Sequence, residues 1–287
     1  MMTMFRVVVA ALLGAGASAF VAVRPAAALR GNSLFARTSI TGGNWKMNPL
    51  TLKEAQDLAH ALTKECVNMP GDAIIFPPYP FLGPIGEIVK GTPIKLGAQS
   101  IFFEDKGAYT GAVAASMVAS MGVTHVLAGH SERRTVFKDD DMAINKKVLK
   151  ILSAGMVPVL CVGESKAEYD AQLVESVVAI QLAKDLAGVS ADDMKKIIIA
   201  YEPVWAIGTG LVCPAAEAQV VHKFVRSKLA TMFSTEVADA VRIQYGGSVT
   251  PESVDELMGM ADIDGCLVGG ASLLSDKFAR ILNYKAM

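Results

Sequence analysis

Cysteine is scarce in this sequence of 287 residues, and it forms no paired motif. The four cysteines lie far apart in the chain, at Cys66, Cys161, Cys213 and Cys266. Without a CxxC pair or a cluster of metal-ligating side chains, the sequence predicts no metal site, no cofactor and no disulfide framework. Scattered thiols are typical of a reducing compartment. Lysine and arginine likewise form no basic stripe, which argues against a nucleic-acid partner.

Acidic residues are absent from the first part of the chain, where the earliest is Glu54. Residues 1–37 also lack lysine but carry four arginines, at Arg6, Arg24, Arg30 and Arg37. A short apolar stretch at residues 7–13 leads into Gly-Ala-Gly-Ala-Ser-Ala, as in a signal peptide with its cleavage site. The stretch is too short and too rich in glycine and alanine for a membrane span.

The residues that follow this stretch have the composition of a transit peptide. Residues 20–39 are rich in arginine, alanine and serine and contain no acidic residue. The junction around Phe20 resembles the two-part leaders of algae with secondary red-type plastids, in which a signal peptide is cut just before a phenylalanine. We therefore expect residues 1–37 to be a cleaved, disordered signal plus transit peptide that directs the protein to the plastid stroma. The mature protein is expected to have no membrane partner. A plain secretory or mitochondrial leader is the alternative.

Strand-like and helix-like segments alternate through the rest of the chain. Apolar, β-branched runs predict buried strands at residues 39–44, 73–77, 94–99, 123–129, 157–162, 197–201, 241–245 and 265–269. Amphipathic patterns predict helices at residues 52–66, 142–153, 174–186, 215–232, 251–260 and 273–282. Eight strands with helices between them predict one α/β domain over residues 38–287, a single (β/α)8 barrel of the TIM-barrel type.

An open, doubly wound sheet is the alternative architecture. Such sheets usually carry a GxGxxG turn after the first strand, and the segment that ends here in Asn44-Trp45-Lys46 has none. A barrel also explains why polar residues follow so many strands, because all strand carboxyl ends open on the face that holds the active site. These polar residues are Asn44, Lys46, Gln99, His130, Glu202 and Ser248.

The segment from Tyr201 to Gly210 places a carboxylate at the end of a buried strand. Pro203 ends the strand, a short apolar stretch follows, and Gly-Thr-Gly closes the loop. This pattern predicts that Glu202 is a general base joined to a flap that can close. A strand-ending glutamate before an ordinary turn is the alternative.

His130 and Lys46 are the other two candidates for chemistry. His130 precedes a short helix expected to start at Ser131, and a helix N-terminus should lower its pKa and leave a neutral hydrogen-bond donor. Lys46 at a barrel mouth is a cation for an anionic substrate, with a solvated rim charge as the alternative. The remaining histidines are expected to face solvent (His60 and His222) or to lie in the core (His125).

Glycine pairs follow the last two predicted strands, at Gly246-Gly247 before Ser248 and at Gly269-Gly270. Glycine lets backbone N–H groups approach a ligand, and the second pair opens the last predicted helix, whose N-terminus favours an anion. Barrels often build their phosphate site from these two loops. Gly208 in the flap is a further candidate donor. Each pair by itself is better explained by a tight turn, but both pairs at these two strand ends favour phosphate binding.

Five segments together resemble the signature segments of the triosephosphate isomerase family. They are Gly42 to Asn48, Gly129 to Arg134, Tyr201 to Gly210, Tyr245 to Ser248, and Leu267 to Ala271, in the family's order and spacing. The resemblance runs from about Ser39 to the C-terminus. The decapeptide around Glu202 is its most specific part.

The resemblance implies an isomerase that interconverts glycerone phosphate and D-glyceraldehyde 3-phosphate through an enediolate, without a cofactor. It implies that Glu202 is the base, His130 a neutral electrophile, and Lys46 with Asn44 the groups that hold the substrate and stabilise the enediolate. Glu132 would position Lys46. Residues implied to bind substrate, chiefly its phosphate, are Gly208, Ser248, Leu267, Gly269 and Gly270. The flap 205–210 would be the lid.

The same resemblance implies a homodimer in which the loop 99–112 enters the neighbouring subunit. Thr110 would reach the partner's site, and Met47 would lie in the interface. The family usually has glutamate where this chain has Ala112, so Arg133 lacks its usual partner. This departure predicts either a weaker dimer or another partner for Arg133. Cys213 precedes Pro214 at the start of a predicted helix and is either a reactive thiolate or a simple hinge residue.

Two rival functions remain open at this point. Another phosphate-binding barrel, such as a sugar-phosphate epimerase or isomerase, would explain the glycine pairs but not Lys46, His130 and Glu202 together. A barrel that binds sugar phosphate or a protein without catalysis is the second rival. The intact set of three chemical groups argues against it.

Overall fold

A computed structural model describes residues 37–209 and 211–285. The predicted leader, apart from Arg37, and Gly210 in the predicted lid therefore lie outside the described residues. Eight parallel strands form a closed barrel in chain order. The strands are β1 (Ile40–Asn44), β2 (Asp72–Phe76), β3 (Ile94–Ala98), β4 (His125–Ala128), β5 (Val157–Val162), β6 (Ile198–Tyr201), β7 (Arg242–Tyr245) and β8 (Gly265–Val268).

Closure of the sheet decides between the two expected architectures. β1 pairs with β8 through Gly42–Leu267 and Gly43–Val268, so the sheet has no open edge. The (β/α)8 barrel is confirmed, and the open doubly wound sheet is wrong. Side chains from alternate strand positions fill the interior, including Ile40, Phe76 and Leu127, all at most 1% exposed. The barrel is therefore a packed core, with its functional surface at one end.

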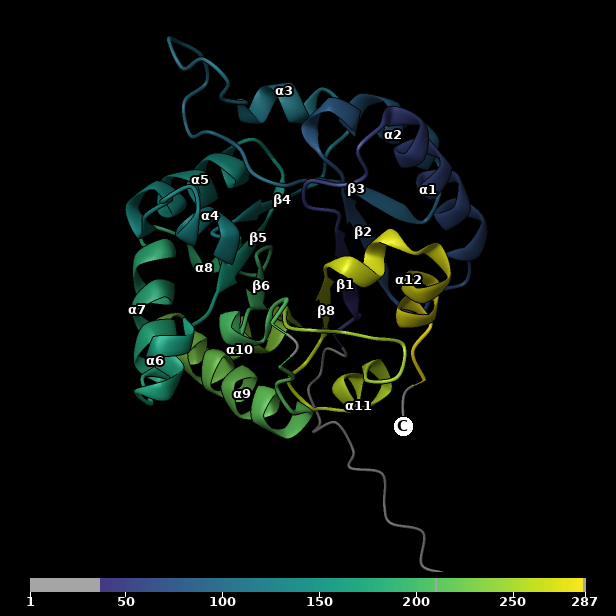
Figure 1. The fold of residues 1–287 in the computed structure, drawn as a ribbon. Coiled ribbons are helices and arrows are strands. Elements are labelled where there is room, and N and C mark those ends of the chain that lie inside the picture. Colours follow the sequence, from purple (N-terminus) through teal and green to yellow (C-terminus); the bar gives the residue numbers. More distant parts are fainter. Residues whose placement is uncertain (1–36, 210, 286–287) are drawn as a thin grey trace, which may run out of the picture. The chain divides into compact units, whose positions relative to one another are not determined.

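Helices surround the strands, as Figure 1 shows. They are α1 (Leu52–Glu65), α2 (Leu82–Val89), α3 (Ala115–Ala119), α4 (Ser131–Thr135), α5 (Asp141–Ser153), α6 (Lys166–Asp170), α7 (Val174–Asp185), α8 (Ala191–Met194), α9 (Ala215–Met232), α10 (Thr235–Ala240), α11 (Val254–Met258) and α12 (Ser275–Leu282). Their buried side chains and the outer faces of the strands form the larger of two hydrophobic clusters. Among the described residues, no helix is long and apolar enough to cross a membrane.

Some predicted helices differ from those observed. The predicted helix 251–260 is reduced to α11, because the Thr250 and Ser253 side chains hydrogen-bond backbone amides of the preceding turn. The predicted helix 273–282 is divided into the 3-10 turn η3 (Gly270–Leu273) and α12. Helix α2 was not predicted, since two glycines and Pro84 obscure its pattern. Pro84 lies in the first turn, where a backbone N–H is not needed.

Arg37 belongs to the folded barrel, although the sequence places it at the end of the leader. Its Nε donates to Oδ1 of Asp264 at 2.7 Å, and its other nitrogens donate to the carbonyls of Asp239 and Ala261. Arg226 holds the second oxygen of Asp264 at 2.8 Å. The barrel therefore includes Arg37, one residue before the predicted boundary.

The remaining histidines test the expectations about burial. His60 is exposed and His125 is buried within β4, as expected. The prediction that His222 faces solvent is wrong: His222 is 0% exposed on the inner face of α9, with its Nδ1 3.2 Å from the carbonyl of Asp262. Burial lowers the pKa of His125 and that of His222 to about 3 each, so both rings are neutral.

Candidate active site

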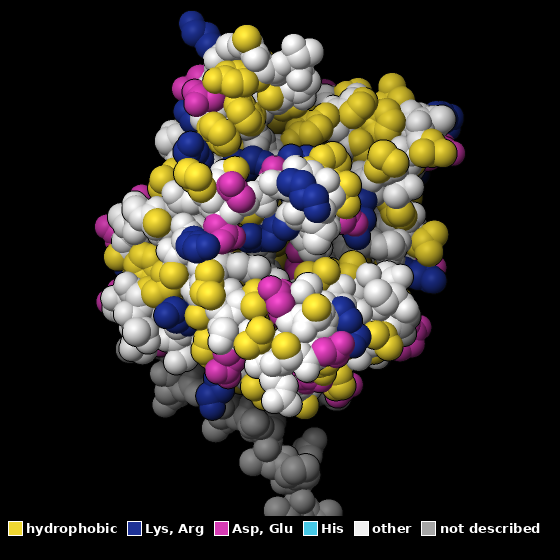
Figure 2. Space-filling model, turned by 60° about the vertical axis from the view of Figure 1, so that its left-hand side comes forward, with side chains coloured by type: hydrophobic (Ala, Val, Ile, Leu, Met, Phe, Trp, Pro, Cys, Tyr) yellow, Lys and Arg dark blue, Asp and Glu magenta, His cyan; other side chains and the backbone are white. Residues whose placement is uncertain are grey.

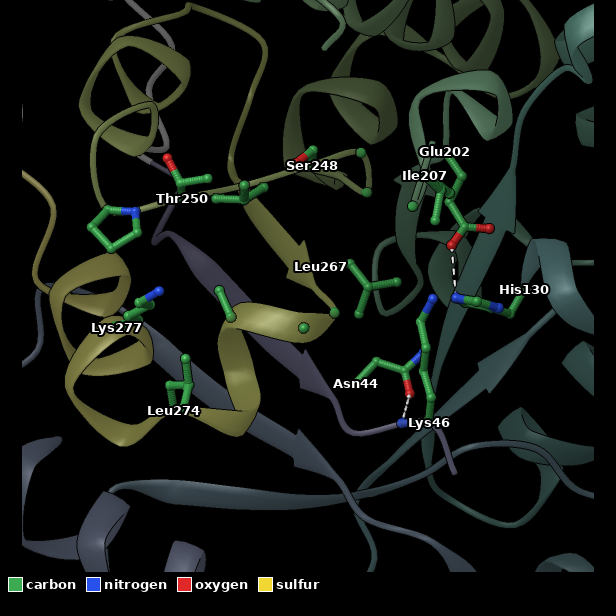
Figure 3. Close-up of a pocket in the computed structure, with 18 of the residues that line it drawn as sticks. Asn44, Lys46, His130, Glu202, Ile207, Ser248, Thr250, Leu267, Leu274 and Lys277 are labelled. Atoms are coloured by element: carbon green, nitrogen blue, oxygen red, sulfur yellow. Dashed lines mark hydrogen bonds and ion pairs between the residues drawn. The ribbon is translucent and has the colours of Figure 1, made fainter. Parts of the chain in front are cut away.

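A cavity of about 450 Å³ lies at the carboxyl ends of the strands. The predicted residues that line it are Asn44, Lys46, His130, Glu202, Gly208, Ser248, Leu267, Gly269 and Gly270. Figure 3 shows Asn44, Lys46, His130 and Glu202 at one end of the cavity, with Thr250, Leu274 and Lys277 at the other. The structure thus brings every predicted catalytic and substrate-binding residue to one site.

Glu202 follows the last residue of β6 and is 2% exposed. Two neighbouring glycines leave room for it. A Cβ atom on Gly163 would lie 1.8 Å from the Glu202 carbonyl oxygen, and one on Gly246 would lie 2.8 Å from Glu202 Cγ. Backbone hydrogen bonds from Glu202 N to Val162 O and from Gly246 N to Tyr201 O fix this close approach. Gly246 is therefore needed for contact with Glu202, a role that the sequence did not suggest.

The two carboxylate oxygens of Glu202 have different partners. Oε1 lies 3.0 Å from Nε2 of His130, the contact drawn in Figure 3. Oε2 accepts a hydrogen bond from the backbone N–H of Ser131 at 2.8 Å. Ser131 is the first residue of α4, so the positive end of a short helix faces this carboxylate. The base is thus held between the imidazole and the helix.

The pKa of His130 differs in direction from the prediction. Burial acts to lower the pKa of the imidazole, but the carboxylates of Glu202 and Glu132 together raise it above its ordinary value. Burial acts to raise the pKa of Glu202, but His130, the Ser131 N–H and Lys46 lower it below its ordinary value. The prediction of a lowered pKa at His130 is therefore wrong for this arrangement, because it considered the helix and not the adjacent carboxylate.

The His130 ring is nevertheless held in one orientation. As the residue that caps α4, it accepts a hydrogen bond at Nδ1 from the backbone N–H of Glu132 at 3.3 Å. An acceptor at Nδ1 leaves the proton on Nε2, which faces Glu202 and the cavity. The contact with Glu202 favours the charged imidazolium. The hydrogen bond from the helix to Nδ1 favours the neutral imidazole, in which the proton is on Nε2. A change in the position of Glu202 therefore changes the charge that His130 prefers.

Lys46 is aimed into the cavity by a strained turn after β1. Its φ angle is 54°, in the left-handed region that non-glycine residues seldom adopt. The Asn44 side chain accepts from Lys46 N at 3.0 Å, and Gln99 donates to the Lys46 carbonyl at 2.7 Å. Lys46 Nζ lies 2.7 Å from Oε1 of Glu132. Gln99, which the sequence marked only as polar, thus holds the backbone of Lys46.

The loops after β7 and β8 line the cavity beyond Lys46. Ser248, Leu267, Gly269 and Gly270 come together there with Gly208 of the flap. The Gly269-Gly270 pair opens the short 3-10 turn η3 and not the last helix. The cavity also includes Ile207 of the predicted flap, and Thr250 and Lys277, which no sequence motif indicated.

A buried carboxylate outside the flap, that of Glu164, holds the first residue of the flap, Trp205. Glu164 is 0% exposed, and its Oε1 accepts hydrogen bonds from Trp205 Nε1 at 2.7 Å and from the Tyr201 hydroxyl at 3.1 Å. Within the flap, the Thr209 hydroxyl donates to the Trp205 carbonyl. At the other end, burial together with the nearby carboxylates of Glu217 and Glu164 raises the pKa of Cys213 to about 12. The thiolate alternative for Cys213 is therefore wrong.

Comparison with known proteins identifies the family to which this arrangement belongs. The family model described as triosephosphate isomerase matches residues 39–285. The chain belongs to the triosephosphate isomerase family. It is 46% identical over 248 residues to the triosephosphate isomerase of Thermoanaerobacter sp. (strain X514), a match that covers 86% of this chain and all of that protein.

Further members of the family show the same extent of similarity. The triosephosphate isomerase of Herpetosiphon aurantiacus is 46% identical over 250 residues, covering 87% of this chain and 100% of its own. The triosephosphate isomerase of Clostridium botulinum is 44% identical over 248 residues, a match that covers 86% of this chain and 100% of that protein. The family match begins at residue 39, so the predicted leader lies entirely outside it.

Family resemblance also predicted an interface, and the structure places its residues. Met47 is 85% exposed and lines a second cavity of about 310 Å³ together with Tyr79, Arg133 and Phe137. Thr110 lies on an exposed loop that projects from the barrel between β3 and α3, at the upper left of Figure 1. In Figure 2 hydrophobic side chains gather on this loop and beside it, at the top of the view.

Arg133, left without its usual partner by Ala112, has one within its own chain. Its Nε and a terminal nitrogen contact the two oxygens of Asp139 at 3.0 and 3.1 Å, and its guanidinium lies over the Phe137 ring. Lys147, which is 3% exposed, also donates to Asp139. The structure thus shows another partner for Arg133, one of the two alternatives that the departure allowed, and the weaker dimer stays a prediction.

Within the residues that the structure describes, no three metal-ligating side chains are grouped closely enough to hold an ion. The groups available for chemistry in the main cavity are a carboxylate, an imidazole, an ammonium group and backbone amides. Such a set suits proton transfer next to a carbonyl, with an anionic part of the substrate bound at the far loops.

Proposed function

We propose that this chain interconverts glycerone phosphate and D-glyceraldehyde 3-phosphate by proton transfer through an enediolate. The observation that carries the proposal is the convergence of Glu202, His130 and Lys46 at one end of a single cavity. The family relationship supports the choice of substrate, since the curated relatives are triosephosphate isomerases.

Glu202 acts as the base in the proposed reaction. Its lowered pKa keeps the carboxylate charged at neutral pH, ready to take the proton from the carbon next to the carbonyl. The proton then returns to the neighbouring carbon, the hydroxyl proton moves from one substrate oxygen to the other, and the carbon–oxygen double bond changes place. No electron donor or acceptor outside the substrate is needed, which is consistent with the predicted lack of a cofactor.

His130 and Lys46 stabilise the negative charge that develops on the substrate oxygens. When Glu202 turns to the substrate carbon, the imidazole loses the carboxylate that favours its charged form. The Glu132 N–H at Nδ1 then favours the neutral ring, with Nε2–H as the donor. Glu132 positions Lys46 through the 2.7 Å ion pair, and Asn44 holds the turn that carries it.

The free energies that these groups contribute to the transition state are sufficient for catalysis. A positioned base contributes about 3–5 kcal/mol, and each aligned oxyanion donor contributes about 2.7–4 kcal/mol. One base and two donors therefore reach about 8–13 kcal/mol, at the lower end of enzymatic acceleration. Binding of the phosphate by Gly208, Ser248, Gly269 and Gly270, with closure of the lid, supplies the remainder.

The experiment that tests this function is a coupled assay on residues 33–287. Glyceraldehyde 3-phosphate is supplied, and formation of glycerone phosphate is followed through a reductase that accepts only that product. We expect isomerisation at an enzymatic rate, with no epimerisation of a pentulose phosphate in a parallel assay. Epimerase activity without isomerisation would support the rival barrel enzyme, and binding without turnover would support the non-catalytic barrel.

We further propose that the active form is a homodimer. The exposed Met47, Val136 and Phe137 side chains are unusual for a solvent-facing surface, with 85%, 68% and 61% of each exposed. The cavity beside Met47 suits the projecting loop of a second copy, so that Thr110 approaches the partner's site. The interface would cover this surface.

Delivery to the plastid stroma remains our proposal for the predicted leader, with its end placed before Arg37, which packs in the barrel. Its support is the acid-free, arginine-bearing composition and the start of the family match at residue 39. A fluorescent fusion of residues 1–40 should accumulate in the stroma. Retention in the secretory pathway or import into mitochondria would contradict this proposal.

A further inference from the structure

Arg134, on the short helix α4, holds the backbone on both sides of His130. Its own backbone N–H donates to the His130 carbonyl at 3.1 Å, and its side-chain Nε donates to the Gly129 carbonyl at 2.8 Å. These carbonyls belong to the two peptide bonds that flank His130. Arg134 itself does not line the main cavity, so it acts on His130 from outside the substrate site.

Glycine at position 129 makes room for the Arg134 guanidinium. The φ angle of Gly129 is 73°, in the left-handed region. A Cβ atom there would lie 2.8 Å from a terminal nitrogen of Arg134 and 3.0 Å from the Cys161 carbonyl oxygen. The same terminal nitrogen donates to that carbonyl at 3.0 Å. The guanidinium therefore joins the carboxyl ends of β4 and β5 beside His130.

Two carboxylates hold the guanidinium from the outer helices. Asp141, the first residue of α5, lies 2.8 Å from one terminal nitrogen, and Asp185, the last residue of α7, lies 2.6 Å from the other. Asp185 has a second anchor, because Asn145 of α5 donates to its backbone carbonyl at 2.9 Å. In Figure 1, α4, α5 and α7 lie on the same side of the barrel. Arg134 thus ties the catalytic segment to two outer helices.

Only arginine has the donors for all four contacts. Nε and the two terminal nitrogens serve two carbonyls and two carboxylates in different directions. A guanidinium is a rigid, planar fork with five N–H donors, whereas a lysine ammonium is a compact point charge. Asp185 is 0% exposed and the Arg134 side chain 16%, so the pair is far less screened than a surface ion pair.

We propose that Arg134 is a positioning residue for the isomerisation, which sets the place of His130 relative to Glu202. This inference depends on the proposed function, in which His130 stabilises charge on the substrate oxygens. The contact of His130 Nε2 with Glu202 at 3.0 Å and the bond from Ser131 N–H to Glu202 at 2.8 Å both start from the segment that Arg134 holds. A displacement of this segment therefore moves the imidazole and the helix end away from the base.

The test is the effect of Arg134→Ala on kcat and KM with glyceraldehyde 3-phosphate. A misplacement of about 1 Å can cost about 100-fold in rate, so we expect kcat to fall by about 10- to 100-fold. KM should change little, because the groups proposed to bind the phosphate lie on other loops. Guanidinium chloride, far below its denaturing range, should restore part of the lost kcat, and sodium chloride at the same concentration should not.

Arg226→Ala is the matched control, because Arg226 on α9 makes the same kinds of contact at the opposite end of the barrel. Its side chain donates to the backbone carbonyls of Ala238 and Val241 and to the carboxylates of Asp262 and Asp264. Val241 and Asp264 directly precede β7 and β8, at the amino ends of the strands. This variant should lose stability but keep its kcat when folded, with no response to guanidinium.

Arg134→Lys, with Arg226→Lys as its control, is the second variant in case Arg134→Ala does not fold. A lysine keeps a positive charge beside buried Asp185, but it cannot serve the Gly129 carbonyl and the three other acceptors together. We therefore expect kcat to fall in Arg134→Lys as well, and to stay unchanged in Arg226→Lys. Circular dichroism establishes that each variant is folded under the assay conditions.

An unchanged kcat in either folded Arg134 variant overturns the proposal. An equal fall in kcat in the matching Arg226 variant also overturns it, since the effect would then follow from the loss of any buried arginine. The same holds if the loss in Arg134→Ala is confined to KM or if guanidinium restores none of the kcat. Absence of isomerised product from the unmodified protein overturns the proposed function instead.

Discussion

Nε2 of His130 lies 3.0 Å from Oε1 of Glu202, and the two side chains are only 7% and 2% exposed. Each group favours the charged form of the other, so the pKa of the imidazole rises and that of the carboxyl falls. Such a buried pair depends strongly on pH, because loss of either charge leaves the other unpaired.

The pair should stabilise the fold most between about pH 4.5 and 6.5. Glu202, with its lowered pKa, contributes above its ordinary value of 4.5 and loses that contribution as the pH falls through its folded pKa. His130, with its raised pKa, contributes fully below 6.5 and loses that contribution as the pH rises through its folded pKa. A double-mutant cycle of His130→Gln and Glu202→Gln by thermal unfolding should give a larger coupling at about pH 5.5 than at about pH 9.

The control for this cycle is Lys53→Gln with Asp57→Asn, a solvent-exposed pair on α1 that lies 2.6 Å apart. Its coupling should be small and should not change between these two pH values. A coupling for His130 and Glu202 that is equally large at both would contradict the assigned charges.

Arg37→Ala should lower the free energy of unfolding by about 1.5–3 kcal/mol, the range for hydrogen bonds to charged groups. The substitution removes the 2.7 Å contact with Asp264 and two further hydrogen bonds to backbone carbonyls. The measurement is urea unfolding of residues 33–287, with Lys53→Ala as the surface control. Equal stability of Arg37→Ala and the unmodified protein would show that the barrel does not need Arg37, and cleavage after this residue would then be compatible with a stable enzyme.

Deletion of residues 207–210 should lower turnover and increase the release of methylglyoxal. An enediolate that is exposed to water can expel its phosphate, and Ile207 and Gly208 line the substrate cavity from the flap. Methylglyoxal per isomerisation event is measured with a colorimetric reagent, and Val212→Ala serves as the control. If product purity is unchanged in the deletion variant, the flap is not the lid.

Met47→Glu should convert the dimer into monomers at micromolar concentration, with loss of activity. A charge would replace an apolar side chain that is 85% exposed in the single chain and that we place in the interface. Leu173→Glu is the control, since Leu173 is also exposed but precedes α7, outside the proposed interface. Sedimentation velocity combined with the isomerase assay decides the matter: a fully active monomer of the unmodified protein would contradict the dimer.

Periodicity and strand-end chemistry predicted the barrel and the members of the site. Strands β1 to β8 were found within one or two residues of their predicted bounds. Short β-branched runs such as Ile197-Ile198-Ile199 leave few alternatives to a buried strand. What local patterns could not predict depends on contacts between distant segments. Buried His222 contacts the carbonyl of Asp262, 40 residues away, and the pKa of His130 is raised by Glu202, 72 residues away. The same holds for Arg37, whose partner Asp264 is 227 residues distant.

The most direct test of the account is the turnover of Glu202→Asp with glyceraldehyde 3-phosphate. Shortening the side chain by one methylene withdraws the base from the substrate carbon, and a misplacement of about 1 Å can cost about 100-fold. We predict a fall in kcat of about that size or more with little change in KM, while Glu87→Asp, on the exposed face of α2, keeps the full rate. A Glu202→Asp enzyme that works nearly as fast as the unmodified protein would contradict the assignment of Glu202 as the base.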